Sequence, residues 1–180
     1  MIWYNEPPHW EEQENRLLVQ AGPQTDFWRL TKGGDVRDSG HFYAQSQEGD
    51  FVTEVKISAE YVTQYNHAGL MVRVDEQHWL KCGVEYVGEE QKASAVVTRV
   101  YSDWSLAPLP PRTTALWLRV VREGTTFTVF YAQDGVDYQM LREAYLPVAA
   151  SVEVGPMCAS SAATGFVVTF EGFRVQRTKD

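Results

Sequence analysis

Apolar and polar residues alternate through most of this sequence with the two-residue period of a β-strand. In the segment 51–62, FVTEVKISAEYV, the odd positions are mostly apolar, whereas the even positions include Glu54, Lys56 and Glu60. Segments 68–74 and 79–87 alternate in the same way, and later segments are rich in β-branched and aromatic residues. This pattern predicts an all-β protein whose strands each bury one face.

Short turn signals separate the predicted strands. Gly124 and Gly135 each lie between two short strands and predict tight hairpins. The proline-rich segment 106–112, LAPLPPR, marks no domain boundary, because the strand pattern resumes unchanged after it. Segment 7–19 has weak helical features, although its last three residues could equally begin a strand. Many short strands with turns every 8–12 residues or so predict one β-sandwich domain, residues 1–180, built from two antiparallel sheets.

Composition excludes several classes of partner. The net charge is −8, which argues against nucleic acid and against an anionic membrane surface, because both require clustered Lys and Arg. The N-terminus has no secretory pattern, and no apolar run is long enough to span a bilayer, so we expect a cytoplasmic protein. The two cysteines form no CxxC motif, and Cys82 is predicted to be a buried strand residue.

The polar faces of the strands carry the candidate binding residues. Leu116, Leu118 and Val120 alternate with Trp117 and Arg119, and other strands show the same division. One interpretation is a solvated surface with cross-strand ion pairs. The other is a concave binding face, where tryptophans stack on a ligand such as a sugar and charged groups hydrogen-bond its hydroxyls. The six tryptophans favour the second, with Trp28, Trp104 and Trp117 as candidates.

Signatures of catalysis are sparse. The sequence contains no G-x-S-x-G, phosphate loop or H-E-x-x-H motif. Glu54 and Glu85 lie on polar faces of different predicted strands and could face each other as a glycosidase pair, or could pair with Arg73 or Arg99 instead. His67 and His78 could approach across a hairpin, but solvated loop histidines are the preferred interpretation. We therefore assign no catalytic residue, metal site or cofactor.

A set of motifs along nearly the whole chain resembles the concanavalin A-like family of unknown function of DUF1349 type, which includes a fungal regulator-of-enolase protein. The motifs are WYNEPPHW, TDFWRLTKGGDVRDSGHF, AGLMVRVDEQHWLKCGVEY, SAVVTRVYSDWS, WLRVVREG and GFVVTFEGF, together with GDF and QDG. The resemblance implies a jelly-roll sandwich and supplies no activity. The chain resembles more distantly the non-catalytic sandwich domain of some β-xylosidases.

The residues within these motifs are the ones we expect along the concave sheet and its rim. They are Trp28, Arg29, His41, Glu54, Arg73, Lys81, Glu85, Arg99, Trp104 and Arg119. Segment 25–43 is expected to leave one strand at Trp28 and re-enter the sandwich at His41, which would place both residues at the rim.

Three functions are compatible with the sequence. The leading hypothesis is a non-catalytic protein that binds a carbohydrate or a similar polyhydroxylated small molecule. The second is a glycosidase or lyase using Glu54 and Glu85. The third is a regulatory protein-interaction module without a small ligand, which predicts an exposed apolar patch and a homodimer through edge strands.

Overall fold

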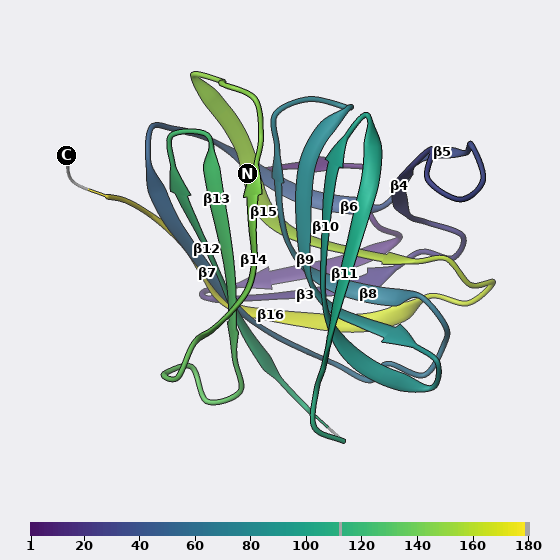
Figure 1. The fold of residues 1–180 in the computed structure, drawn as a ribbon. Helices are drawn as coiled ribbons and strands as arrows, with labels where there is room; N and C mark the ends of the chain where they lie inside the picture. The colour runs from purple at the N-terminus through teal and green to yellow at the C-terminus, as the bar shows by residue number, and fades with distance from the viewer. Residues whose placement is uncertain (112, 179–180) are drawn as a thin grey trace.

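The chain forms two antiparallel sheets that pack face to face (Figure 1). This computed structural model describes residues 1–111 and 113–178, and within them no helix could span a bilayer. Sheet A has the strand order β1 (Ile2–Tyr4), β6 (His41–Glu48), β15 (Ser151–Ser160), β8 (Asn66–Arg73), β9 (His78–Val87), β10 (Glu90–Arg99) and β11 (Tyr101–Pro108). Sheet B has the order β14 (Gln139–Tyr145), β13 (Thr126–Ala132), β12 (Leu116–Glu123), β7 (Phe51–Ala59), β16 (Phe166–Arg177), β3 (Arg16–Ala21) and β2 (His9–Gln13). The predicted all-β jelly-roll sandwich is confirmed.

The core lies between the two sheets and consists of the apolar positions of the alternating pattern. Leu70 and Leu80 face it from sheet A, and Leu116, Leu118 and Val120 face it from sheet B, all of them fully buried. Burying each such side chain contributes about 1.5–3 kcal/mol to the free energy of unfolding. The interior also contains Cys82 and Cys158 as free thiols.

Consecutive strands often belong to different sheets. The chain passes from β6 in sheet A to β7 in sheet B and returns to sheet A at β8. Strand β7 pairs with β12 and β16, whereas β8 pairs with β9 and β15. Two strands that follow each other in the sequence can therefore have their polar faces on opposite sides of the molecule.

The segment between β3 and β6, residues 22–40, covers part of the outer face of sheet A. It contains the two short strands β4 (Phe27–Arg29) and β5 (Val36–Asp38), which lie at the right in Figure 1. Phe27 is fully buried, and its ring meets Trp79 edge to face at 6.2 Å. Met71 and Met157 extend this second apolar cluster. We call this segment the covering loop.

The structure confirms one of the two expected tight hairpins and shows the conformation of segment 7–19. Segment 7–19 is extended and contains β2 and the first half of β3. The turn at Gly124 is a tight hairpin, with Gly124 at a φ of 60°. The tight hairpin expected at Gly135 is wrong, because β13 ends at Ala132 and β14 begins only at Gln139. Within this longer loop the Asp134 carboxylate accepts hydrogen bonds from two backbone N–H groups.

The proline-rich segment 106–112 is partly a strand rather than a loop. Strand β11 continues through Pro108, which is compatible with proline because β11 is an edge strand. Arg112, the last residue of that segment, lies outside the described residues.

Two glycines meet where β8 and β9 pair beneath the covering loop. Gly69 and Gly83 are direct cross-strand partners. A Cβ atom built on Gly83 would lie 1.9 Å from the carbonyl oxygen of Ala68, which is backbone and cannot swing away. The close approach of these two strands therefore requires glycine.

We expect Gly83→Ala to lower the free energy of unfolding by at least about 1–3 kcal/mol, because the new methyl group forces the two strands apart. In a chain of this size each kcal/mol corresponds to a fall in Tm of about 2–4 °C. Gly33→Ala is the matched control, since nothing lies within 4 Å of its added Cβ. Equal Tm values for the two variants in calorimetry would contradict the prediction.

Candidate functional site

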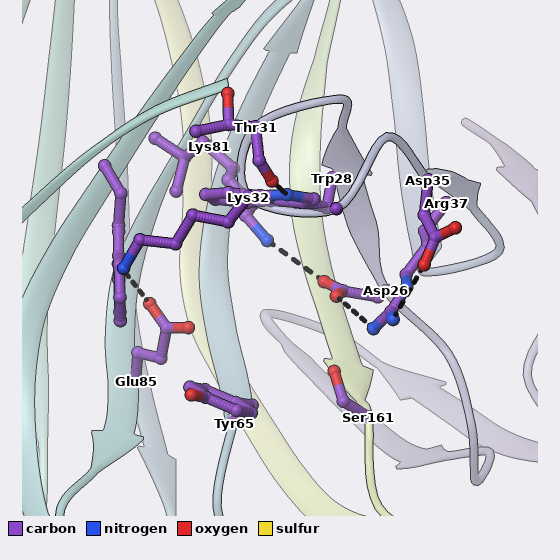
Figure 2. Close-up of a pocket in the computed structure, with 13 residues that line it drawn as sticks. Asp26, Trp28, Thr31, Lys32, Asp35, Arg37, Tyr65, Lys81, Glu85 and Ser161 are labelled. Atoms are coloured by element: carbon purple, nitrogen blue, oxygen red, sulfur yellow. Dashed lines mark hydrogen bonds and ion pairs between the residues drawn. The ribbon is translucent and has the colours of Figure 1, made fainter. Parts of the chain in front are cut away.

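A pocket of about 220 Å³ lies between the covering loop and the outer face of sheet A (Figure 2). The covering loop forms one side of it, and strands β9, β10 and β11 form the other. The lining residues are Asp26, Trp28, Thr31, Lys32, Gly33, Asp35, Arg37, Tyr65, Lys81, Glu85, Val96, Trp104 and Ser161. The pocket thus combines aromatic walls with charged groups of both signs.

The aromatic walls are held in place by hydrogen bonds. Trp28 and Trp104 meet edge to face at 6.4 Å, with an angle of 85° between their planes. The indole N–H of Trp28 donates to the Thr31 carbonyl oxygen at 2.7 Å, and that of Trp104 donates to Glu85 at 2.9 Å. Tyr65 stands beside Trp104 at 6.4 Å. Two fixed rings at nearly a right angle therefore define a corner of the pocket.

A buried ammonium group lies at the base of the pocket. Lys81 is only 3% exposed, and its Nζ lies 3.1 Å from His67 Nε2 and 3.4 Å from Asp26 Oδ1. His67 Nδ1 lies 2.9 Å from the Tyr65 carbonyl oxygen, which can only accept. The proton of the neutral imidazole is therefore on Nδ1, and Nε2 accepts from Lys81. Two of the three ammonium donors are engaged by described residues, and none of the other described residues accepts from the third, which can therefore meet a ligand.

The surroundings of the ammonium fix the charge states of its two partners. Burial lowers the pKa of His67, and the charge of Lys81 lowers it further, so His67 is neutral at pH 7. Burial opposes ionisation of Asp26, but the charge and hydrogen bond of Lys81, together with the Phe27 N–H, outweigh it and lower the pKa of Asp26. The base of the pocket therefore holds an ammonium–carboxylate pair beside a neutral imidazole.

Glu85 supplies a second carboxylate. Its Oε2 accepts from the Ser94 hydroxyl at 2.6 Å and from Trp104. Within residues 1–111 and 113–178, Oε1 has no hydrogen-bond donor. Figure 2 shows Glu85 and Asp26 on opposite sides of the pocket, with the Lys81 ammonium between them. The pocket thus presents a cationic donor flanked by two anionic acceptors.

The structure brings four of the expected site residues together, namely Trp28, Lys81, Glu85 and Trp104. His41 is buried instead: its Nε2 accepts from the Gly22 N–H at 2.9 Å, and its Nδ1 lies 2.6 Å from the Asn5 carbonyl oxygen. The expected rim position of His41 is therefore wrong, and this residue anchors the start of the covering loop.

The arginines expected at the site do not line the pocket. Arg73 donates two hydrogen bonds to Asp38 of the covering loop, at 2.7 and 2.8 Å. Arg99 is exposed at the end of β10 and pairs with Asp103 at 3.4 Å. Arg29 is half-buried on β4, where its backbone N–H donates to Ser102.

The alternative in which Glu54 and Glu85 face each other as a catalytic pair is wrong, because their strands belong to different sheets. Glu54 lies on β7 in sheet B and pairs with Arg119 and Arg174 on the opposite side of the molecule. The suggested pairing of either glutamate with Arg73 or Arg99 is also wrong. Alternation along a strand shows which face of a sheet a residue occupies, but not which of the two sheets the strand belongs to. The sequence alone therefore could not separate Glu54 and Arg119 from the pocket residues.

The alternative in which His67 and His78 approach each other is wrong as well. The preferred interpretation, a solvated loop histidine, is wrong for His67, which is buried in β8. His67 is the second residue of β8 and His78 is the first residue of β9, so the two lie at opposite ends of this antiparallel hairpin. His67 pairs across the strands with Glu85, whereas His78 contacts Asp75 at 2.9 Å. Among the described residues, no group of three potential metal ligands occurs.

Sequence reasoning missed Asp26 and His67, which hold the ammonium of Lys81. Asp26 directly precedes the Phe27–Trp28 pair in the sequence. His67 lies in β8 and directly precedes the AGLMVR motif. The register of β8 against β9 would have placed His67 opposite Glu85, but no turn signal in the sequence defines that register.

The two-sheet sandwich is similar in fold to a solved carbohydrate-binding module and to part of a GH43 protein. The carbohydrate-binding module CBM66 from Bacillus subtilis superposes with a TM-score of 0.62 at 12% identity, covering 97% of this chain and 94% of that chain. The GH43 protein BlXynB from Bacillus licheniformis superposes with a TM-score of 0.75 at 16% identity, over 96% of this chain and 36% of that chain. At these identities the likeness shows the fold alone.

The chain belongs to the family described as protein of unknown function (DUF1349), which matches residues 3–178. It is 34% identical to Regulation of enolase protein 1 from Saccharomyces cerevisiae over 168 residues, 93% of this chain and 85% of the relative. A crystal structure of a functionally unknown protein from Saccharomyces cerevisiae superposes with a TM-score of 0.95 at 32% identity, covering 99% of this chain and 97% of that chain. The family expected from the sequence motifs is confirmed.

The lowered pKa of His67 predicts a loss of stability at mildly acidic pH. Below about pH 6.5 the unfolded chain binds a proton at His67 that the folded chain does not bind. The stability is thus fully present above this pH and is lost as the pH falls through the lower pKa of the folded state. The loss is about 1.4 kcal/mol for each pH unit by which the pKa is lowered.

We therefore expect His67→Gln to lose less stability than the wild type between about pH 7.5 and 5, measured by urea unfolding. The glutamine can accept from Lys81 and donate to the Tyr65 carbonyl oxygen in place of the imidazole. His9→Gln, at an exposed position of β2, controls for the loss of a histidine. Parallel profiles for His67→Gln and the wild type would show that His67 is not the group responsible.

Proposed function

We propose that this protein is a single-domain, non-catalytic binding protein for a carbohydrate or a similar polyhydroxylated small molecule, held in the pocket beside sheet A. One observation carries the proposal: the buried Lys81 ammonium lies between the Asp26 and Glu85 carboxylates, in a pocket that is also lined by Trp28 and Trp104. The two free cysteines suit a reducing compartment, and we place the protein in the cytoplasm.

The polar groups of the pocket match neighbouring hydroxyls of a sugar. A hydroxyl both donates and accepts, so it can accept from Lys81 while it donates to a carboxylate. Hydrogen bonds with one charged partner contribute about 1.5–3 kcal/mol each, more than bonds between neutral groups. A ligand with two adjacent hydroxyls can use Lys81 together with Asp26 or Glu85.

The aromatic corner suits the apolar faces of a sugar ring. Trp28 and Trp104 are fixed by their own hydrogen bonds, so binding costs little side-chain entropy. The cavity of about 220 Å³ is smaller than the roughly 300–1,000 Å³ of pockets for drug-sized ligands. These dimensions favour a single sugar unit in the pocket.

Binding is favoured over glycoside hydrolysis by the state of the carboxylates. Hydrolysis needs a carboxylic acid whose pKa is raised so that it can protonate the leaving group. The pKa of Asp26 is lowered instead, and Glu54 lies on the other sheet. The Asp26 carboxylate is thus suited to accepting hydrogen bonds from hydroxyls.

A thermal-shift screen against monosaccharides tests the proposal. A ligand at about 100 times its Kd stabilises the folded state by about 2.7 kcal/mol, which raises Tm by several degrees. We expect Glu85→Gln to weaken binding of the hit at least about tenfold, because a charged acceptor is lost.

Glu54→Gln is the matched control, since it removes a carboxylate of sheet B far from the pocket. We expect its ligand affinity to equal that of the wild type. The proposal fails if no sugar stabilises the protein, or if both substitutions weaken binding equally.

A further inference from the structure

The pocket continues into a second, polar groove along the covering loop. This groove has a volume of about 570 Å³ and is lined by Gln24, Thr25, Asp26, Val36, Arg37, Asp38, Ser39 and Ser161. Asp26, Arg37 and Ser161 line both cavities. The pocket and the groove are therefore neighbours that meet at these three side chains.

Arg37 at this junction is loosely held. Its guanidinium lies 3.6 Å from Asp26 and 3.5 Å from Asp35, and half of its side chain is exposed (51%). Exposed ion pairs at such distances add little stability. The guanidinium can therefore turn from these carboxylates to oxygen atoms of a ligand, for which it has five N–H donors.

Ser161 at the junction has an unused hydroxyl. Its Oγ is buried and has no hydrogen-bond partner among the described residues. Buried polar atoms without a partner are uncommon in folded proteins. Figure 2 places Ser161 on the Asp26 side of the pocket, at the end that the groove shares. Because Ser161 lines both cavities, rotation of its short side chain between staggered rotamers would turn this hydroxyl towards a ligand that passes from the pocket into the groove.

We propose that the groove is a second subsite for a neutral sugar unit, so that the full ligand is an oligosaccharide with its terminal unit in the pocket. This inference rests on the proposed function. None of the described residues that line the groove is aromatic, so the second unit is held by hydrogen bonds rather than by stacking. Arg37 and Ser161 contact the oxygen atoms near the linkage between the two units.

The charges of the groove favour a neutral unit over a phosphate. Asp26 and Asp38 both line it, and Asp38 is already paired with Arg73. Arg37 is the cation that lines the groove, and it is shared with two carboxylates. Among the described residues that line the groove, an anionic group therefore finds no cation that is free of a carboxylate, whereas hydroxyls find carboxylate acceptors and uncharged partners such as Gln24 and Ser39.

Calorimetric titration of paired sugars tests the inference. The pairs are xylose with xylobiose, and glucose with cellobiose and maltose. We expect one disaccharide to bind the wild type about tenfold more tightly than its monosaccharide. This gain in affinity corresponds to one or two further hydrogen bonds. Arg37→Ala and Gln24→Ala should each reduce this ratio, whereas Arg99→Ala, an exposed arginine on β10, should leave it unchanged.

The outcomes separate the two proposals. If neither sugar of any pair binds, the proposed function fails, and the second subsite fails with it. If monosaccharide and disaccharide bind equally and the Arg37→Ala and Gln24→Ala ratios equal that of the wild type, the second subsite alone is overturned. A preference for a sugar phosphate over the disaccharide would also overturn it.

Discussion

The buried ammonium of Lys81 is the interaction on which the site depends. A buried charge is costly unless it is paired and hydrogen-bonded. Its partners come from separate parts of the chain, since His67 lies near the start of β8 and Asp26 belongs to the covering loop. The same contacts that neutralise Lys81 therefore hold the covering loop against sheet A. The contacts of Asp26 and His67 with Lys81 therefore both form the pocket and compensate the buried charge.

Apolar packing supports this polar centre. Phe27 of the covering loop packs against Trp79 of sheet A, and the adjacent residue Trp28 forms the pocket wall. On the sheet, Gly83 lies between Lys81 and Glu85 on the same face of β9, and its missing side chain lets β8 approach closely. The outer face of sheet A thus has a small apolar cluster of its own, and the charged groups of the pocket lie beside it.

The sequence predicted the fold well and the site only in part. Alternation placed Leu118 and Lys81 on the correct faces of their strands, because one buried face per strand is a local property. It could not assign β7 and β9 to different sheets, so Glu54 was placed with Glu85. That assignment depends on pairing between strands distant in sequence. Asp26 was missed for a similar reason, since its partner Lys81 is 55 residues away.

The most direct test of this account is an NMR titration that follows the indole N–H signals of the tryptophans with the sugar that gives the largest thermal shift. Trp28 and Trp104 line the pocket, whereas Trp10 and Trp117 lie on strands of sheet B. The account predicts that the signals of Trp28 and Trp104 move together with one Kd while those of Trp10 and Trp117 stay fixed. Movement of Trp10 or Trp117 with Trp28 and Trp104 unchanged would contradict it.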